Sequence, residues 1–358
     1  MKVTTLALGL FILTFSLQAQ TNAPKYSNEF LAIGVDARAL AMSGAFTAVS
    51  DDISSGYWNP AGLNYQTDDY AGSLMHAQYF AGIANYDYAA FSAKIDEVST
   101  LAISAIRLGI DDIPDTRFLY DANGAINYDN IQFFSSADYG FLFSYARKLK
   151  ILGGIESGLN AKIIYRNAGS FASAWGYGLD IGFQKSIKKL KIGLMLKDIT
   201  GTYNTWNHNT SLVADIYTQT GNKIPENSIE ITLPRAILGV SYRIEFLKKM
   251  SALVSVDLET TLDGKRNTLV KSDVISLDPK AGVELGYMDK FFIRGGIGQF
   301  QQIQEFDRSY TTLFQPNFGV GVKLNQFCID YALTDVGDQT ESPYSHVISI
   351  KATFNDKK

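Results

Sequence analysis

The sequence predicts an all-β protein, a transmembrane antiparallel β-barrel of about 14 strands with an N-terminal plug inside its lumen. Three observations lead to this prediction: apolar and polar residues alternate from residue 69 onward, the alternating segments are long, and the connections between them alternate in length. The last segment shows the alternation most clearly. Between Tyr344 and Phe354, one set of alternate residues reads Tyr, His, Ile, Ile, Ala, Phe, and the other reads Ser, Val, Ser, Lys, Thr. Since a strand sends successive side chains to opposite faces, this segment has one largely apolar face and one largely polar face.

The length of the alternating segments distinguishes a membrane barrel from a soluble sandwich. Many of them have about ten residues or more, whereas strands of globular proteins average about five to six residues. A tilted strand that crosses a bilayer needs ~9–11 residues. A soluble sandwich, the alternative, would have to bury either all the polar sets or all the aromatic ones. The predicted strands are residues 69–80, 86–95, 98–111, 138–149, 151–166, 174–187, 189–199, 229–246, 249–263, 275–289, 290–301, 313–324, 326–335 and 343–354.

The connections between these strands are sorted by length. Tight, polar connections follow every second strand, as at Asp96-Glu97 and Lys188-Lys189. They alternate with wider ones near 112–137, 167–173, 200–228, 264–274, 302–312 and 336–342, and only the first connection on the wide side, 81–85, is short. Outer-membrane barrels have short periplasmic turns and longer outer loops. An even number of strands returns both termini to the periplasmic side. We therefore expect the first and last strands to pair and leave no free edge, with Phe354 at the periplasmic rim.

The two faces of each predicted strand have different composition. In the segment 174–187, one set is Trp, Tyr, Leu, Ile and Phe, and the other is Gly, Gly, Asp, Gly and Gln. In a barrel the apolar sets face lipid and the polar sets face the lumen. The two signs of charge in the predicted lumen nearly balance, so we expect ion pairs across it. The predicted lumen acids are Glu156, Asp180, Asp257, Glu259, Glu284 and Asp330, and the bases are Lys162, Arg235, Arg243, Lys280, Arg294, Lys323 and Lys351.

Composition agrees with this class and excludes others. Of the 358 residues, 46% are hydrophobic and 13% aromatic, which suits strands and membrane interfaces and argues against disorder. The net charge of -4 gives no support to nucleic-acid binding. The single cysteine, Cys328, excludes an internal disulfide and a cysteine-based metal cluster.

The N-terminus is typical of an exported protein. A positive charge at Lys2 precedes an apolar run from Leu6 to Leu17, and a small residue, Ala19, offers a cleavage point. This run is shorter than the ~20 apolar residues of a spanning helix. We therefore predict a signal peptide over 1–19, a plug over 20–66 and a transmembrane barrel over 67–358.

The sharpest local motif lies in the predicted plug. Residues 36–52 read DARALAMSGAFTAVSDD, and residues 57–63 read YWNPAGL. The first run suits a short helix. Pro60 forces Asn59 away from the helical region, and Gly62 permits a tight reversal. Trp58 is large enough to wedge this turn against a barrel wall.

This motif resembles the PorV/PorQ family of Bacteroidetes outer-membrane proteins, over about 27 residues from Asp36 to Leu63. That family is related to FadL, the long-chain fatty acid transporter with a fourteen-stranded barrel and a plug, or hatch, that contains an Asn-Pro-Ala sequence. The resemblance implies a FadL-like fold in the outer membrane of a Gram-negative bacterium. It assigns Asn59, Pro60, Ala61 and Gly62 to the hatch motif, with Arg38 and Trp58 as anchors.

The resemblance also implies a function. PorV belongs to the type IX protein secretion system, where it binds the signal domain of exported cargo and works with other subunits. Our main expectation is therefore a secretion component with cargo or secretion-system proteins as partners, and with membrane lipid around it. Exposed aromatic residues often anchor interfaces, so Tyr203, Trp206 and Tyr217 in the loop 200–228 are candidate partner contacts.

Two other functions stay open. The first is uptake of hydrophobic small molecules in the manner of FadL, with a hydrophobic ligand or lipid in the lumen. That function needs a continuous apolar pocket from the outer loops into the lumen. The second is a general diffusion porin, which needs an open channel and is incompatible with an ordered plug.

Enzymatic activity and cofactors are not predicted. The chain has three histidines and neither a Gly-x-Ser-x-Gly elbow nor a His-Glu-x-x-His motif. The alternation places His76 in the lumen set and His346 in the lipid-facing set, while His208 lies in a wide loop. Residues 121–124 and 127–130 offer oxygen ligands for calcium, but ordinary turn chemistry explains the same Asp, Asn and Gly residues.

Overall fold

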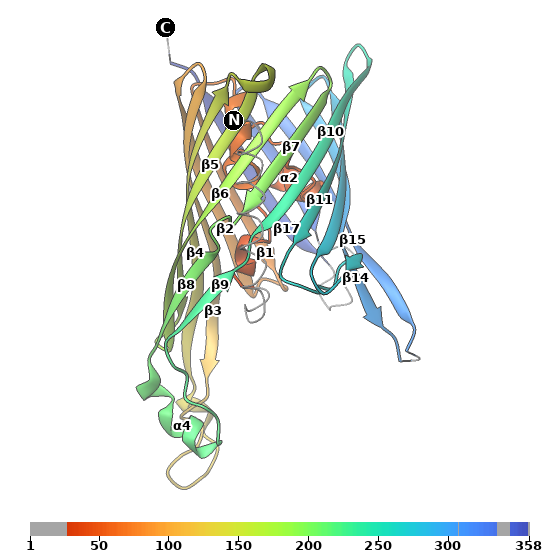
Figure 1. Ribbon diagram of the computed structural model, residues 1–358. Coiled ribbons are helices and arrows are strands. Elements are labelled where there is room, and N and C mark those ends of the chain that lie inside the picture. Colours follow the sequence, from red (N-terminus) through yellow and green to blue (C-terminus); the bar gives the residue numbers. More distant parts are fainter. Residues whose placement is uncertain (1–26, 307, 335–343, 357–358) are drawn as a thin grey trace, which may run out of the picture.

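The computed structural model describes residues 27–356 except 307 and 335–343; the predicted signal peptide lies outside these residues. Seventeen strands of the described chain form one antiparallel sheet. The sheet closes into a barrel because β1 pairs with both β2 and β17 (Figure 1). This pairing of the first and last strands was predicted from the alternation, and Tyr70 lies opposite Phe354 at the rim.

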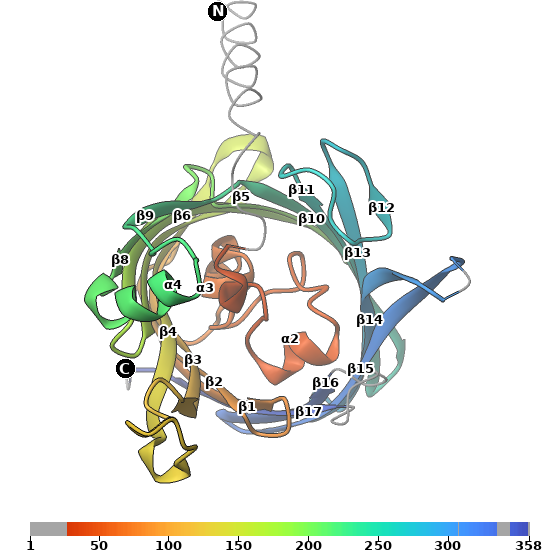
Figure 2. The ribbon, with the colours of Figure 1, turned by 90° about the horizontal axis from the view of Figure 1, so that it is seen from below.

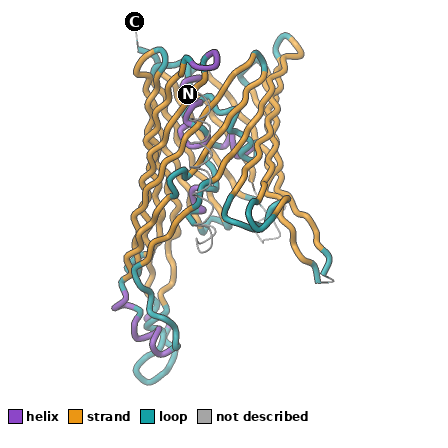
Figure 3. The backbone as a smooth tube through the Cα atoms, viewed as in Figure 1, coloured by secondary structure: helices purple, strands orange, loops and turns teal. Residues whose placement is uncertain are grey.

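The strands account for most of the described chain, as the tube in Figure 3 shows. Their bounds are β1 (Tyr70–Tyr79), β2 (Ala84–Asp96), β3 (Ser99–Asp115), β4 (Gln132–Leu149), β5 (Ile155–Ala168), β6 (Ala172–Ile187), β7 (Leu190–Lys197), β8 (Thr202–His208), β9 (Ser228–Thr232), β10 (Arg235–Leu247), β11 (Met250–Thr261), β12 (Val270–Lys271), β13 (Ser276–Tyr287), β14 (Phe291–Gln304), β15 (Tyr310–Leu324), β16 (Phe327–Thr334) and β17 (Ser345–Phe354).

Among the described residues, these strands make a wall of 14 strand positions around the barrel, each of which we call a stave. β7 and β8 both pair with β6 and follow each other along one stave. β9 and β10 form the next stave, since β9 pairs with β8 and β10 pairs with β7. The two-residue β12 only pairs with the outer end of β13. The predicted strand number is therefore confirmed.

The segment from 200 to 228 differs from its prediction as a loop. Residues 202–208 form β8, which continues the wall beyond the break at 198–201. Tyr203 and Trp206 therefore lie in a strand, and only Tyr217 lies in the connection, on helix α4 (Ala214–Gln219). The strand was missed because this stretch reads Thr-Tyr-Asn-Thr-Trp-Asn-His and lacks the apolar set of a lipid-facing strand.

Only short connections lie at one end of the barrel, and the longest connections lie at the other, as predicted (Figure 1). The predicted wide connections near 167–173 and 302–312 are shorter than expected, because the strands on either side extend into them. At the long-loop end, β3 and β4 extend further than predicted, to Asp115 and from Gln132, and form a projection with β8, β9 and α4. Short 3-10 helices, η4 (Tyr128–Asn130) and η6 (Thr210–Leu212), lie in these connections, and η5 (Ile151–Gly153) lies in a tight turn. We call the two ends the outer end and the periplasmic end.

The outer surface of the barrel is apolar. Large hydrophobic side chains such as Leu74, Ile293 and Phe318 stand exposed on it, and polar side chains such as Asp257 and Asp330 are buried inside. An apolar band around a closed barrel is the surface of an outer-membrane protein, so the predicted location is confirmed. Among the described residues, none of the helices combines the length and the apolar character that a bilayer crossing requires.

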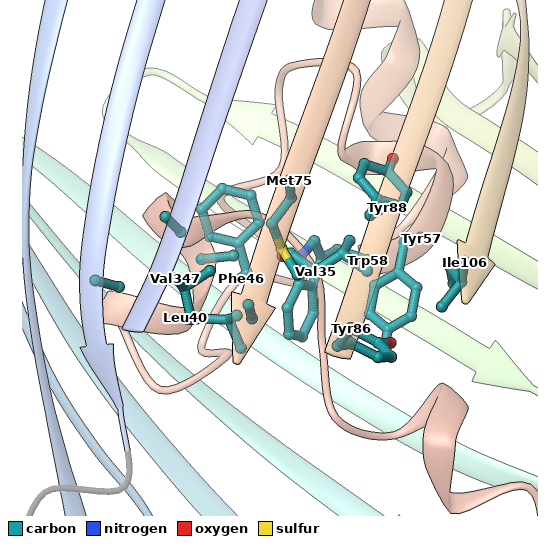
Figure 4. Packing of buried hydrophobic residues seen from close by; sticks show 14 of the residues in the cluster. Val35, Leu40, Phe46, Tyr57, Trp58, Met75, Tyr86, Tyr88, Ile106 and Val347 are labelled. Atoms are coloured by element: carbon teal, nitrogen blue, oxygen red, sulfur yellow. The ribbon is translucent and has the colours of Figure 1, made fainter. Parts of the chain in front are cut away.

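Residues 27–66, which we call the inner segment, lie inside the barrel (Figure 2). They form η2 (Glu29–Leu31), α2 (Ala37–Ala41), α3 (Ser55–Trp58) and η3 (Pro60–Tyr65). The helix predicted after residue 37 is α2, which is only five residues long. Figure 4 shows the core, in which Leu40, Phe46 and Trp58 of the inner segment pack beside Tyr86 and Ile106 of the wall.

Apolar residues thus face inward on β1, β2 and β3, where the inner segment packs against the wall. Met75, Ala77, Tyr86 and Tyr88 are buried in this core. The predicted lumen position of His76 is therefore wrong. His76 is 53% exposed and points outward, because its neighbours Met75 and Ala77 occupy the inner face.

Candidate functional site

The Asn-Pro-Ala turn ties the inner segment both to itself and to the barrel. Asn59 has extended backbone angles, φ -162 and ψ 104, and Pro60 begins η3. The side chain of Asn59 accepts a hydrogen bond from the backbone N–H of Ala61 at 3.2 Å. Its amide donates to the carbonyl oxygens of Thr47 at 3.0 Å and Phe183 at 3.2 Å. Phe183 lies on β6, so this buried side chain fixes the turn against the wall.

Glycines on the inner face allow the inner segment to lie directly on the strand backbones. A Cβ atom at Gly182 would overlap Asn59, and one at Gly296 would overlap Met42. Gly296 lies on the inner face of β14, and its lack of a side chain leaves room for the inner segment. Gly62 is equally constrained, since a Cβ there would overlap the carbonyl oxygen of Ser50.

Trp58 organises the inner segment itself. Its indole Nε1 donates to the carbonyl oxygen of Val35 at 2.9 Å. Its ring lies 6.0 Å from Phe46 and 5.0 Å from Tyr57, measured between ring centroids. The indole thus ties parts of the inner segment together, in the core that this segment shares with the wall. Its role as a wedge for the turn stays a prediction.

Arg38 and Asp52 of the inner segment join four barrel side chains in a closed ring of alternating charge, which we call the charge ring. The ring runs from Arg38 to Glu284 (2.8 Å), Arg294 (2.6 Å), Asp330 (2.7 Å), Lys351 (3.5 Å), Asp52 (2.9 Å) and back to Arg38 (3.5 Å). The barrel members come from β13, β14, β16 and β17. Every charge therefore has two neighbours of opposite sign.

Further acids of the inner segment reinforce this ring. Lys351 Nζ lies 2.9 Å from Asp36, and Arg38 Nη1 lies 2.9 Å from Asp51. Burial alone would lower the pKa of Arg38, but Glu284, Asp51 and Asp52 raise that pKa well above its usual value. Burial alone would raise the pKa of Asp52, but Lys351 and Arg38 hold it well below its usual range. Both side chains are therefore charged at neutral pH.

A second charge cluster lies along the inner faces of β5, β6, β10, β11 and β13. Lys162 contacts Asp198 and lies 2.7 Å from Asp180. Arg235 lies 3.7 Å from Asp198 and 3.3 Å from Glu259, which also binds Lys280 at 2.7 Å. The balanced lumen charges led us to expect ion pairs across the lumen, whereas these pairs mostly join neighbouring strands of the wall.

The other predicted lumen charges have different surroundings. The carboxylate of Asp257 accepts hydrogen bonds from the backbone N–H groups of Phe46 (3.0 Å) and Thr47 (2.8 Å). Glu156 accepts from Asn64 at 3.0 Å. Arg243 is exposed at the periplasmic rim, where its guanidinium lies 3.1 Å from Asp289.

Sequence reasoning missed several residues of this interface. Asp36 and Asp52 were not in the predicted lumen set, since they lie outside the alternating strands. Asp198 was also missed, although it lies near the end of the predicted strand 189–199. Gln184 was also missed, although its place in the polar set of β6 was the available signal. Its amide donates to the carbonyl oxygen of Thr47 at 2.8 Å and to the hydroxyl of Ser50 at 2.8 Å.

A cavity of 360 Å³ lies between the outer side of the inner segment and the barrel wall. Apolar residues line one side of it, among them Leu40, Trp58, Tyr79, Leu108 and Ile110. Lys197, Arg235, Glu259 and Lys280 line the other side. The ammonium of Lys197 lies 4.4 Å from the centre of the Tyr57 ring. The cavity thus offers an apolar surface with a polar edge.

The remaining predicted residues lie away from this cavity. Trp206 donates to Glu230 at 3.0 Å, and Tyr203 is exposed on β8. His346 contacts the hydroxyl of Tyr331 at 2.6 Å on the outer surface. The carboxylate of Asp121 accepts from Asn130 at 3.0 Å, as in an ordinary turn. In the described part of the chain, the search for three or more His, Cys, Asp or Glu side chains that could hold a metal finds none.

Comparison with known proteins shows the fold. No family model and no curated protein matches this chain. The toluene transporter TodX of P. putida aligns at 12% identity with a TM-score of 0.54, covering 90% of this chain and 99% of that chain. CymD, a monoaromatic hydrocarbon channel, aligns at 12% identity with a TM-score of 0.53, covering 90% and 98%. A FadL homologue of Pseudomonas aeruginosa aligns at 11% identity with a TM-score of 0.49, covering 90% and 98%. At such identities the likeness establishes the FadL-like barrel fold alone.

Proposed function

We propose that this chain is an outer-membrane channel that takes up hydrophobic small molecules. The cavity carries this proposal: it is apolar along β1 and β3, and it lies between the inner segment and the outer end of the barrel. Ligand pockets are concave and mostly apolar, with a few polar groups that orient the ligand. TodX and CymD, which are named as a transporter and a channel of aromatic hydrocarbons, share the fold and support the proposal.

The inner segment gives the channel a gate in this proposal. Its residues Ala37, Phe46, Asn59 and Leu63 are fully buried against the wall and against one another. A molecule that enters the cavity must therefore displace part of the inner segment or pass beside it. This ordered segment disfavours the general porin that the sequence left open.

Filling the cavity tests the proposal. The variant Leu108→Trp replaces a leucine side chain in the cavity with a larger indole. Leu101→Trp places the same indole on the lipid-facing side of the same strand. We expect about a tenfold loss of toluene permeation in liposomes that contain Leu108→Trp, because the indole would occupy the apolar space that the ligand needs. Leu101→Trp should permeate toluene at the wild-type rate. Equal rates for all three proteins, each folded, would refute the proposal.

A role in type IX secretion is the second candidate. The resemblance of residues 36–63 to the PorV/PorQ family is the observation that favours it. The experiment is purification from native outer membrane in mild detergent, followed by identification of bound proteins. Stoichiometric secretion subunits or cargo, together with unchanged toluene permeation in the Leu108→Trp variant, would favour this role over uptake.

A further inference from the structure

The lipid-facing wall of the first strands has an apolar groove that the proposed transport does not use. Its volume is 500 Å³. Small residues, Gly72, Ala89 and Ala105, form its floor, and Leu74, Phe91 and Ile350 form its sides. Leu74 is 65% exposed, so the groove lies on the outer surface and is separate from the lumen cavity.

The register of β1, β2 and β3 explains the shape of this groove. Ala89 lies opposite Leu74 on β1 and opposite Ala105 on β3. Two neighbouring strands therefore present a methyl group where the surrounding wall presents large side chains. Toward the periplasmic end, Tyr70 stacks on Phe91 with ring centroids 6.2 Å apart. In a bilayer, a hydrocarbon chain is the natural occupant of such a surface.

A polar triad lies at the outer end of the groove, two residues further along the lipid-facing side of β1, β2 and β3. His76, Asp87 and Arg107 are cross-strand neighbours on β1, β2 and β3. His76 Nδ1 lies 2.7 Å from one carboxylate oxygen of Asp87, and Arg107 Nη1 lies 3.4 Å from the other. Arg107 also has a side-chain hydrogen bond with Tyr139. Two bases are thus held in place around one acid.

The neighbouring strands show that this triad lies at the membrane boundary. The row of cross-strand neighbours that contains the triad continues from Arg107 through Tyr139 and Tyr165 to Trp175. These aromatic residues form a girdle of the kind found at membrane interfaces. The next row outward begins with Gln78 and Asn85 and contains no large apolar side chain as far as β6. An arginine on the lipid-facing side is tolerated at this level and costly at the bilayer centre.

We propose that this wall binds one lipid A molecule, with an acyl chain in the groove and a phosphate on the triad. Asp87 uses both carboxylate oxygens to position the bases, and the remaining guanidinium N–H groups of Arg107 can donate to phosphate. The triad lies at the outer end of the barrel, where the long loops mark the outer leaflet. Lipid A is the phosphorylated lipid of that leaflet, which favours it over a glycerophospholipid.

Lipid retention after purification tests the site. The full-length protein is extracted from native outer membrane into mild detergent, and native mass spectrometry counts the lipid A that stays bound. The double variant Ala89→Leu/Ala105→Leu fills the groove, and Arg107→Gln removes the guanidinium. We expect about a tenfold loss of retained lipid A in Arg107→Gln, because a hydrogen bond to a charged group is strong. We expect about the same loss in the double variant, because the added leucine side chains would occupy the space of the acyl chain. Arg107→Lys keeps the charge and should retain more lipid A than Arg107→Gln.

A matched control separates the site from the general surface. Ala161→Leu adds the same side chain to the outer face of β5, away from the groove, and should retain lipid A as the wild type does. Heat-modifiable migration on gels verifies that each barrel is folded. Equal retention by all variants, or a wild type that retains only glycerophospholipid, would overturn the proposal. Toluene permeation is a separate measurement, so the two proposals can fail independently.

Discussion

Single positions without a side chain decide how closely the inner segment approaches the barrel. Gly158 and Gly182 on neighbouring strands both lie against the Asn-Pro-Ala turn, and a Cβ at either would overlap it. The sequence showed glycines in the inward sets but not which of them touch the inner segment. That depends on contacts between residues far apart in the sequence, such as Asn59 and Gly182, which no local pattern records.

A methyl group at Gly182 should loosen the inner segment. Because the added carbon would overlap the side chain of Asn59, we expect Gly182→Ala to destabilise the packed segment by ~1–3 kcal/mol. Limited proteolysis of the folded barrel, read as the cleavage rate within residues 27–66, measures this effect. Gly295→Ala is the control, since its Cβ would meet ordinary contacts of 3.8 and 3.9 Å. Identical cleavage rates for both variants would contradict this role of Gly182.

At the scale of elements, long-range ion pairs hold the inner segment to the strands. The barrel members of the charge ring were among the predicted lumen charges, because they lie in the polar sets of their strands. Their partners, Arg38 on the short helix α2 and Asp52 in a bend, lie outside the strands, where strand alternation assigns no face. The alternation could therefore name four of the six members of the ring, and only the folded molecule pairs them.

Removing one charge from the ring should release the inner segment. Arg38→Met leaves Glu284 and Asp51 without one of their cations, and breaking a buried pair typically costs ~3–5 kcal/mol. We expect residues 27–66 to become sensitive to protease while the barrel keeps its heat-modifiable migration. Arg243→Met is the matched control, because its pair with Asp289 is exposed and worth ~0–1 kcal/mol. Protection of the segment in Arg38→Met equal to that in the control would show that the ring does not hold it.

At the scale of the whole molecule, closure depends on the last strand. β17 pairs with both β1 and β16, so its loss would expose two strand edges. In a bilayer, unpaired backbone groups cost several kcal/mol each.

Deleting residues 344–358 should therefore prevent folding. We expect the truncated chain not to accumulate in the outer membrane as a heat-modifiable species, whereas a deletion of residues 357–358 alone should accumulate normally. Membrane fractionation with gels of heated and unheated samples measures both. A folded, membrane-inserted chain that lacks 344–358 would contradict closure by β17.

The sequence by itself determined the barrel, its strand number and its orientation, because strand periodicity, strand length and loop length are local properties that the bilayer imposes. It also located the turn at Asn59 and Pro60, where backbone restrictions act within two residues. Only the tertiary structure decided which way β1 to β3 face. The inner segment packs against these strands and makes their inner side apolar, so Met75 faces inward and His76 outward, against the usual rule. The cavity and the pairing of the charge ring have the same origin, since both exist only where the inner segment meets the wall.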